Sequence, residues 1–294
     1  MSESRIQPRA SRPPRARTRP ARLLVVHAGL VASALTAAPS GAAAQTRYYN
    51  TDMGRPTRIE DAYAIERYSL DLYVAPLAVE RRRGEYEWFA MPELAYGIVP
   101  RTQVGLGLPI ASRSAPEGRR TGLAGVNLSA LYNFNVETRS FPAFGARASV
   151  LVPAGSLAPE NVHSSLQGMA TRTFDWARVH ANVAYTFGDE PTAGVDGVNL
   201  TRWTSGVAVD RTFPLRSFLV SAEAFASQPL GDDAETQWTA GAGIRYQLTP
   251  NLSIDGGIAR RLTGDDRGWS VTFGLARVLG VRALPPGLGI WRGG

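Results

Sequence analysis

The chain has 294 residues, a formal net charge of +7 and no cysteine, so disulfides, thiolate catalysis, cysteine-ligated metals and a lipid on an N-terminal cysteine are excluded. The positive charge does not indicate a nucleic-acid partner, because residues 1–44 carry seven Arg and one Glu (+6) and the remaining chain carries 25 basic and 24 acidic residues (+1). The length allows one large domain or two ordinary ones.

The chain begins with a segment typical of exported proteins. An Arg-rich start is followed by the short apolar run "LLVVHAGLVASALTAA" (23–38) and by the small residues of "PSGAAAQ". This order predicts a secretory signal peptide over residues 1–44, cleaved after Ala44. A retained membrane anchor is the alternative, although the run is short and rich in Ala and Ser. No later stretch approaches 18 consecutive apolar residues, so we expect no transmembrane helix after the leader.

Beyond the leader, apolar and polar side chains alternate with a period of two, which indicates strands with one apolar face. In "QWTAGAGIRYQL" (237–248), for example, Trp238, Ile244 and Tyr246 fall on one face, and Gln237 and Arg245 fall on the other. Twelve segments of this kind occur, near residues 67–79, 86–98, 102–111, 123–135, 143–153, 164–174, 177–188, 200–210, 216–227, 236–248, 252–262 and 268–279.

The connections between these segments are sorted by length. Those after the even-numbered segments are short, whereas those near 111–122, 153–164, 188–199 and 227–237 are longer and more polar. Short turns at one end and longer loops at the other are typical of an outer-membrane barrel. A soluble β-sandwich also alternates but has no reason to sort its loops in this way. We therefore predict an all-β fold, a transmembrane antiparallel up-and-down β-barrel of about 12 strands over residues 67–279.

Two segments flank the predicted barrel. Residues 45–66 include most of "RPTRIEDAYAIER" (55–67), a stretch that is expected either to extend into the periplasm or to fold back as a plug. Residues 280–294 form a C-terminal tail beyond the last strand. The predicted location is the bacterial outer membrane, reached after export and with the long loops at the cell surface.

Three stretches carry a family resemblance: "RPTRIEDAYAIERYSLDLYV" (55–74), "PELAYGIVPRTQVGLGLPI" (92–110) and "YQLTPNLSIDGGIARRL" (246–262). With them, residues 56–279 resemble the outer-membrane β-barrel family associated with the MetA pathway of phenol degradation, whose members are described as transporters. The resemblance implies a twelve-stranded barrel and uptake of small, aromatic or hydrophobic molecules. It implies no catalytic residues.

Candidate catalytic residues are few. The sequence lacks GxxxxGK[ST], HExxH and GxSxG motifs, so we expect no catalytic site, no cofactor and no bound metal. His163 and Ser165 lie two residues apart, on one face of a predicted strand. Such a pair resembles that of outer-membrane lipid hydrolases, in which His activates the hydroxyl group. A polar junction between loop and strand is the simpler interpretation. His180 is expected to be a polar residue of the lumen.

Charged residues on the inward face of the strands are the stronger candidates. Six of them are predicted to line the lumen and to set its selectivity: Glu93, Arg147, Arg202, Glu223, Arg245 and Asp255. Pairing across the lumen is an equally good explanation of these mixed charges. The predicted function is a passive channel or transporter for small solutes. The alternatives are a lipid hydrolase using His163/Ser165 and a non-conducting structural barrel. Expected partners are outer-membrane lipid, small-molecule solutes and the barrel-assembly machinery, with no nucleic acid.

Overall fold

The computed structural model describes residues 51, 55–74, 77–82, 84–115, 118–190, 200–213, 216–231, 234–264 and 267–280. The predicted signal peptide lies outside these residues, as does the tail from 281 onward. No helix in the described ranges is long and apolar enough to cross a membrane.

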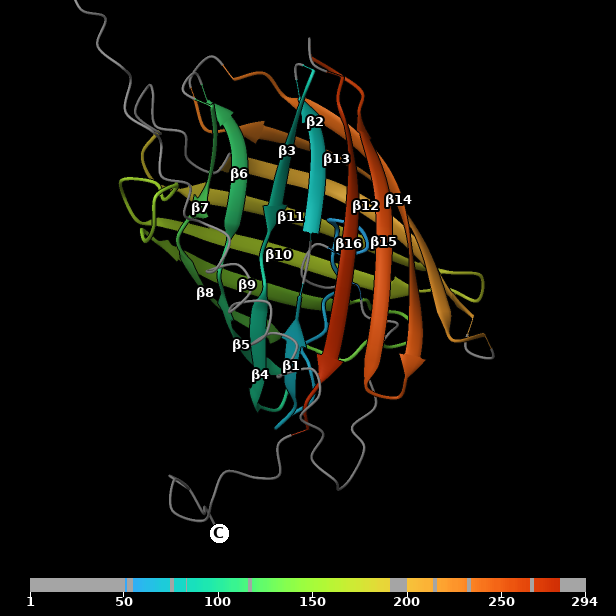
Figure 1. The fold of residues 1–294 in the computed structure, drawn as a ribbon. Helices are drawn as coiled ribbons and strands as arrows, with labels where there is room; N and C mark the ends of the chain where they lie inside the picture. The colour runs from blue at the N-terminus through green and yellow to red at the C-terminus, as the bar shows by residue number, and fades with distance from the viewer. Residues whose placement is uncertain are drawn as a thin grey trace, which may run out of the picture. The chain divides into compact units, whose positions relative to one another are not determined.

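The chain forms one antiparallel sheet that closes on itself, because the first strand pairs with the last (Figure 1). Asp71 lies opposite Val278 in this closing pair. The sixteen strand segments are β1 (Leu70–Tyr73), β2 (Leu77–Arg82), β3 (Glu85–Ala90), β4 (Glu93–Val99), β5 (Thr102–Gly107), β6 (Ile110–Ala115), β7 (Gly118–Leu123), β8 (Val126–Asn133), β9 (Ala143–Val152), β10 (His163–Thr173), β11 (Arg178–Phe187), β12 (Thr201–Phe213), β13 (Phe218–Pro229), β14 (Gln237–Thr249), β15 (Leu252–Arg261) and β16 (Trp269–Val278).

Four of the strands are interrupted near their middle. β1 and β2 are halves of one strand, as are β3 and β4, β5 and β6, and β7 and β8, so the sixteen segments make 16 − 4 = 12 strands. Pro92 and Pro109 sit in two of the interruptions, where proline cannot donate a ladder hydrogen bond. The Leu108 N–H donates to the Pro92 carbonyl at 2.9 Å, which keeps the neighbouring strands joined at this level. The predicted twelve-stranded antiparallel barrel is confirmed.

One predicted loop is a pair of strands instead. The long connection expected at 111–122 is a hairpin in which β6 pairs with β7, from Ile110 opposite Leu123 to Ala115 opposite Gly118. Its sequence lacks apolar alternation, and β7 is largely exposed. Beyond the hydrocarbon layer a strand has no lipid to face, so the sequence pattern that marks the other strands is absent here.

The hairpin edge is covered by a loop. β7 pairs only with β6 among the described strands. β9 pairs with β8, the other half of the same interrupted strand, and ends at Val152. The following loop crosses this place, where the Leu157 N–H donates to the Leu123 carbonyl at 3.0 Å. The Leu157 side chain is 1% exposed and packs against Ala111 and Ala124. The loop after β9 therefore packs against the β6–β7 hairpin where ladder hydrogen bonds between β7 and β9 are missing.

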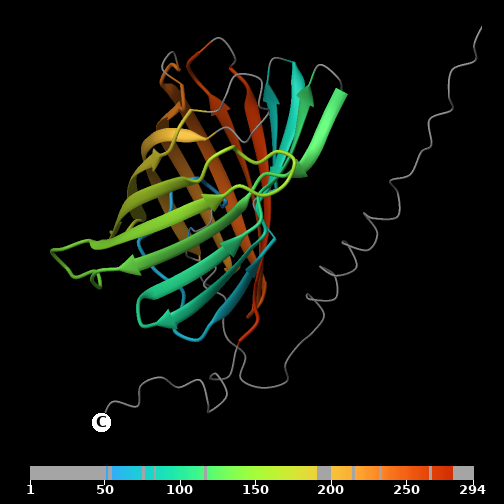
Figure 2. The same ribbon diagram turned by 90° about the vertical axis from the view of Figure 1, so that its left-hand side faces the viewer.

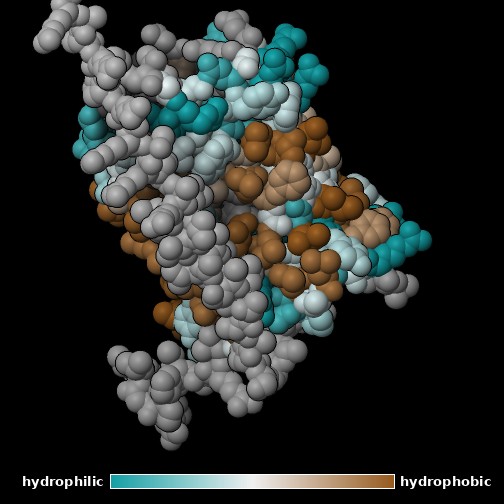
Figure 3. Space-filling view, viewed as in Figure 1, coloured by the Kyte–Doolittle hydropathy of each residue, from teal (hydrophilic) through white to brown (hydrophobic). Residues whose placement is uncertain are grey.

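The barrel is apolar outside and polar inside, the reverse of a soluble protein. Large hydrophobic side chains on the strands are exposed, including Leu128, Val183, Val207, Ile244 and Ile258. Figure 3 shows apolar residues gathered over the middle of one face, with hydrophilic ones at its upper rim. Buried side chains are instead polar or charged at many inward positions, such as Gln103, Asn133, Thr171, His180, Asn182, Asp210 and Ser253. A closed ring with an exposed apolar surface fits lipid, and it excludes the soluble sandwich.

The strands tilt strongly against the barrel axis, so those on opposite walls cross in projection (Figures 1 and 2). Short turns join the strands at one end, for example at 174–177 and 250–251. At the other end lie the loops at 153–162 and 230–236, as predicted, and the connection that follows β11, of which 191–199 lie outside the described residues.

The lipid face can be tested with two adjacent residues of β11. Val183 is 59% exposed on the outer surface, whereas Ala184 lines the internal cavity. Val183→Arg is expected to destabilise the refolded barrel by about 2–4 kcal/mol, because a charge at mid-membrane must leave water. Ala184→Arg should cost clearly less. Urea titrations in lipid vesicles would measure both, and equal losses would contradict the assigned register.

The orientation can be tested at two exposed polar residues. Glu160 lies in a loop at the long-loop end, and Asp175 lies in a turn at the short-turn end. Because the chain is expected to enter from the periplasm, Glu160→Cys should react with a membrane-impermeant maleimide on intact cells. Asp175→Cys should react only after the outer membrane is permeabilised. Early labelling of the second variant would overturn the orientation.

Candidate functional site

The barrel lumen contains a segment of the chain itself. Residues 55–69, here called the luminal segment, precede β1 and lie inside the ring of strands. Arg55 contacts β15, Ile59 contacts β13, Ala62 contacts β10, and Ile65 contacts β5. These strands lie on different sides of the barrel, so the segment crosses the lumen.

A buried ion cluster fixes the start of the luminal segment. The Arg55 guanidinium donates to Asp255 Oδ2 at 2.6 Å, and both side chains are 1% exposed or less. Arg245 donates to the Arg55 carbonyl at 2.6 Å, and its Nε lies 3.5 Å from Asp255. One carboxylate thus serves two cations away from water, where hydrogen-bonded ion pairs are strong and the loss of one partner is costly.

Backbone hydrogen bonds hold the middle of the luminal segment against the wall. The Ile59 N–H donates to Glu223 Oε2 at 2.8 Å. The Ala62 N–H donates to Thr171 Oγ1 at 2.9 Å, and its carbonyl accepts from Asn133 at 2.9 Å. These side chains replace the strand partners that an irregular segment lacks, because buried N–H and C=O groups must be hydrogen-bonded.

Glycines on the wall make room for this backbone. A Cβ on Gly97 would lie 1.9 Å from the Glu66 carbonyl oxygen, and one on Gly145 would lie 2.8 Å from that of Ala62. At Gly257 the clash would be with the Pro56 carbonyl, at 2.4 Å. The strand glycines therefore mark the path of the luminal segment.

A second charge cluster surrounds Asp61. Arg178 binds Asp210 with two parallel hydrogen bonds of 2.9 and 2.8 Å, and it lies 3.8 Å from Asp61. His180, which the sequence assigned to the lumen, is fully buried between Asp210 Oδ2 at 2.7 Å and Thr171 Oγ1 at 3.0 Å. The chain folds back at this point, since the Thr51 N–H donates to Asp61 Oδ2 at 3.0 Å.

The open part of the lumen is a cavity of about 630 Å³ on the long-loop side of the luminal segment. The contacts of the luminal segment fall close to the short turns, as Gly97, Thr171 and Arg245 show. The cavity is lined by residues 56–60 of this segment and by strand residues toward the long-loop end, such as Ser165 and Trp203. The luminal segment therefore lies between the cavity and the short-turn end.

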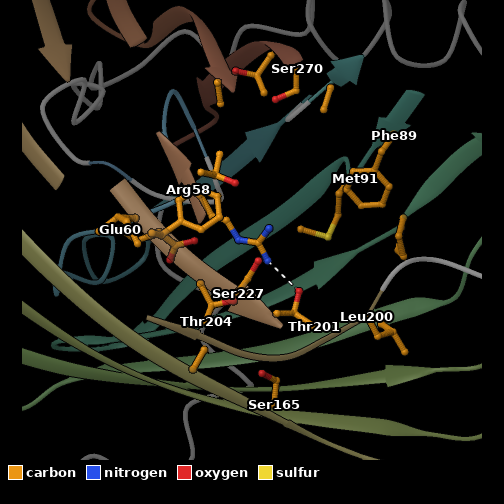
Figure 4. Close-up of a pocket in the computed structure, with 18 of the residues that line it drawn as sticks. Arg58, Glu60, Phe89, Met91, Ser165, Leu200, Thr201, Thr204, Ser227 and Ser270 are labelled. Atoms are coloured by element: carbon orange, nitrogen blue, oxygen red, sulfur yellow. Dashed lines mark hydrogen bonds between the residues drawn. The ribbon is translucent and has the colours of Figure 1, made fainter. Parts of the chain in front are cut away.

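Arg58 rises from the luminal segment into this cavity (Figure 4). It donates to Thr201 Oγ1 at 3.1 Å, and its guanidinium lies 5.3 Å from the centre of the Phe225 ring. The side chain is exposed to the cavity but enclosed by the barrel, so desolvation lowers its pKa. Glu223, Glu80 and Glu60 oppose this shift, because nearby carboxylates favour the charged form.

The structure places five of the six predicted lumen residues around the luminal segment or the cavity. Arg147 pairs with Glu60 at 2.9 Å, and Glu223, Arg245 and Asp255 bind the luminal segment as described above. Glu93 is 1% exposed and accepts a hydrogen bond from Ser129 at 3.5 Å. Arg202 lies apart from them, where it donates to the Gly188 carbonyl at 3.1 Å.

The partners of these residues were not identified from the sequence. Arg55, Arg58, Glu60 and Asp61 fall in a segment for which the sequence left two paths open. The charge-rich stretch "RPTRIED" (55–61) was the available signal, since it supplies partners for an excess of inward charges. A folded-back path accounts for both sets of charges at once.

The geometry does not join His163 and Ser165 into a catalytic pair. The His163 ring nitrogens lie 2.9 Å from the carbonyl oxygens of Asn161 and Asp189. Ser165 Oγ donates instead to the Tyr185 carbonyl at 3.2 Å. These contacts place both ring nitrogens against backbone oxygens and away from the serine hydroxyl. Across the described ranges, no three His, Asp or Glu side chains gather as a metal site.

A closed barrel with an apolar exterior, a charged interior and a luminal segment defines the chain as an outer-membrane-type β-barrel. Residues 54–277 match the protein family described as "Putative MetA-pathway of phenol degradation", and the chain belongs to this family. No curated protein sequence matches the chain.

A solved outer-membrane channel shares the fold. The COG4313 outer membrane channel from Pseudomonas putida F1 superposes with a TM-score of 0.54 at 13% identity, over 78% of this chain and 99% of that one. The NanC porin gives a TM-score of 0.48 at 9% identity, and the KdgM porin gives 0.46 at 14%; each comparison covers 71% of this chain and 98% of the porin.

The buried ion cluster can be tested through Asp255. Asp255→Ala leaves Arg55 and Arg245 without this carboxylate and should lower the free energy of unfolding by about 3–5 kcal/mol. Ser253→Ala is the control, since Ser253 is a buried inward residue two positions away on the same strand. Urea unfolding would measure both. Losses of similar size would mean that the cluster adds little to stability.

Proposed function

We propose that the protein is a passive channel of the outer membrane for small solutes, with the luminal segment acting as its plug. The observation that carries the proposal is a cavity of about 630 Å³ with a mixed polar and apolar lining inside a closed barrel, with a non-strand segment between it and the short-turn end. Barrels of eight strands are filled by side chains, and those of sixteen to eighteen hold an aqueous channel. At twelve strands the contents of the lumen decide, and here they leave open space.

The cavity supports a preference for small solutes with an aromatic or hydrophobic part. Its volume lies in the range of about 300–1,000 Å³ that suits small molecules. Phe89, Met91, Trp203 and Phe225 contribute to a lining that also contains Ser, Thr, Asn and charged side chains. Such a mixed wall favours solutes with both an apolar and a polar part.

We further propose that Arg147, Arg202 and Arg245, against Glu93, Glu223 and Asp255, set the ion selectivity of the channel. Most of these charges are engaged by the luminal segment in the plugged state, as in the Arg147–Glu60 and Arg55–Asp255 pairs. Their effect on passing ions should therefore be greatest once the luminal segment has left the lumen.

The alternative functions find less support. A lipid hydrolase needs a hydroxyl activated by a base, and the His163 and Ser165 side chains are hydrogen-bonded to separate backbone carbonyls. A non-conducting structural barrel is consistent with the fold, and conductance distinguishes it from a channel.

Conductance tests the channel and its plug together. The purified protein should give small conductance steps in planar bilayers, and deletion of residues 46–65 should enlarge them because the lumen is then wider. Substituting Ser for both Arg147 and Arg245 in the deletion variant should shift the reversal potential toward cation selectivity, since two positive charges leave the lumen.

Arg267→Ser is the control for this shift. It removes a positive charge from an exposed loop residue outside the cavity lining, so the selectivity should not move. A folded, inserted barrel that shows neither conductance nor solute-dependent liposome swelling, even without residues 46–65, would refute the channel and leave the structural barrel.

A further inference from the structure

Arg58 is the one exposed residue within the stretch 55–62. The other seven residues of this stretch are buried against the wall. The backbone beside Arg58 is fixed through Ile59, whose N–H donates to Glu223, and through Arg55, which pairs with Asp255. A rigid backbone thus presents a cation to open space.

Arg58 also differs from neighbouring cations in its partners. Arg147 pairs with Glu60, and Arg261 pairs with Glu80. The Arg58 guanidinium forms no salt bridge with any residue that the structure describes, and Thr201 is its one hydrogen-bond partner there. A guanidinium has five N–H donors in a planar fork. With one donor used, the fork remains open on its cavity side.

The surroundings of Arg58 suit an anionic group with an apolar body. In Figure 4, Thr201, Thr204 and Ser227 lie around the guanidinium, so their hydroxyls can add hydrogen bonds to an acceptor held there. Phe89 and Met91 lie across the cavity from it. A polar corner therefore faces an apolar one within a single small cavity.

The carboxylates near Arg58 do not occupy the position that an anionic ligand would take beside its guanidinium. Glu60 and Glu80 are each neutralised by an arginine, and Glu223 accepts the Ile59 N–H. Glu87 and Glu93 line the side formed by β3 and β4. These two carboxylates repel an anion from their wall, so the charges of the cavity orient an anionic group toward Arg58.

We propose that Arg58 binds the carboxylate of a small amphipathic monoacid, whose apolar body packs toward Phe89 and Met91. This inference rests on the proposed channel and names the class of solute that the channel selects. Guanidinium and carboxylate match in a two-pronged geometry, and such charge-assisted hydrogen bonds are the strong ones. The low-dielectric walls of the barrel around the cavity strengthen the attraction.

Benzoate and its neutral counterpart benzamide test the proposal, since they differ mainly in charge. Isothermal titration calorimetry on the full mature chain in detergent should show benzoate binding about tenfold or more tightly than benzamide. Arg58→Gln should abolish this preference. Arg58→Lys should retain part of it, because lysine keeps the charge but loses the fork.

Arg267→Gln is the matched control, because it removes an equal charge from an exposed loop residue and should keep the wild-type preference. Equal binding of the two probes by the wild type, or an unchanged preference in folded Arg58→Gln, would overturn the anion site. Liposome swelling with arabinose tests the channel separately. Liposome swelling without a preference for benzoate would support the channel and reject the anion site. A preference for benzoate without swelling would support the anion site and reject the channel.

Discussion

The closure of the sheet between β1 and β16 is the constraint on which the rest of the structure depends. Lipid offers no hydrogen-bond partners, so the strands of a spanning sheet must pair with one another within the hydrocarbon layer. Closure directs every second side chain inward, and the inward set includes Glu93, Glu223, Arg245 and Asp255. These charges cannot remain unpaired in an enclosed space, because burial without a partner costs several kcal/mol per ion. The luminal segment satisfies many of them.

The luminal segment therefore both lines the cavity and fills part of the lumen. It supplies Arg55 to Asp255, Glu60 to Arg147 and backbone N–H groups to Glu223 and Thr171. Glycines make room at several places where this backbone passes close to the wall, as at Gly97 and Gly145. In the proposed channel the same charges would face the lumen after the luminal segment leaves it, so the stability of the barrel and any movement of this segment would be coupled. The Asp255 and deletion variants probe the two sides of this coupling.

The sequence predicted the barrel well because lipid enforces a simple rule. Strands β8 to β16 face hydrocarbon on one side, and their alternation is readable from residues such as Val183 and Ile258. The β6–β7 hairpin was not predicted from the sequence, because its polar strands face no lipid. The site was harder to predict. Alternation assigned inward residues such as Arg147 to the lumen, but their partners lie about 90 to 200 positions away along the chain. An irregular segment has no period from which its path could be read.

The position of Arg58 follows from this division of roles. The charges that hold the luminal segment form ion pairs with the wall. The residues of the segment that touch the wall are buried. A residue of the same segment that points away from the wall forms no such ion pair and is not buried against the wall, so its charge contributes little to the fold. Arg58 is such a residue, and its guanidinium faces the cavity with Thr201 as its hydrogen-bond partner among the described residues. A cation that faces open space and forms no salt bridge with the described residues is available to a passing anion. The plug of the proposed channel would then also be its recognition element.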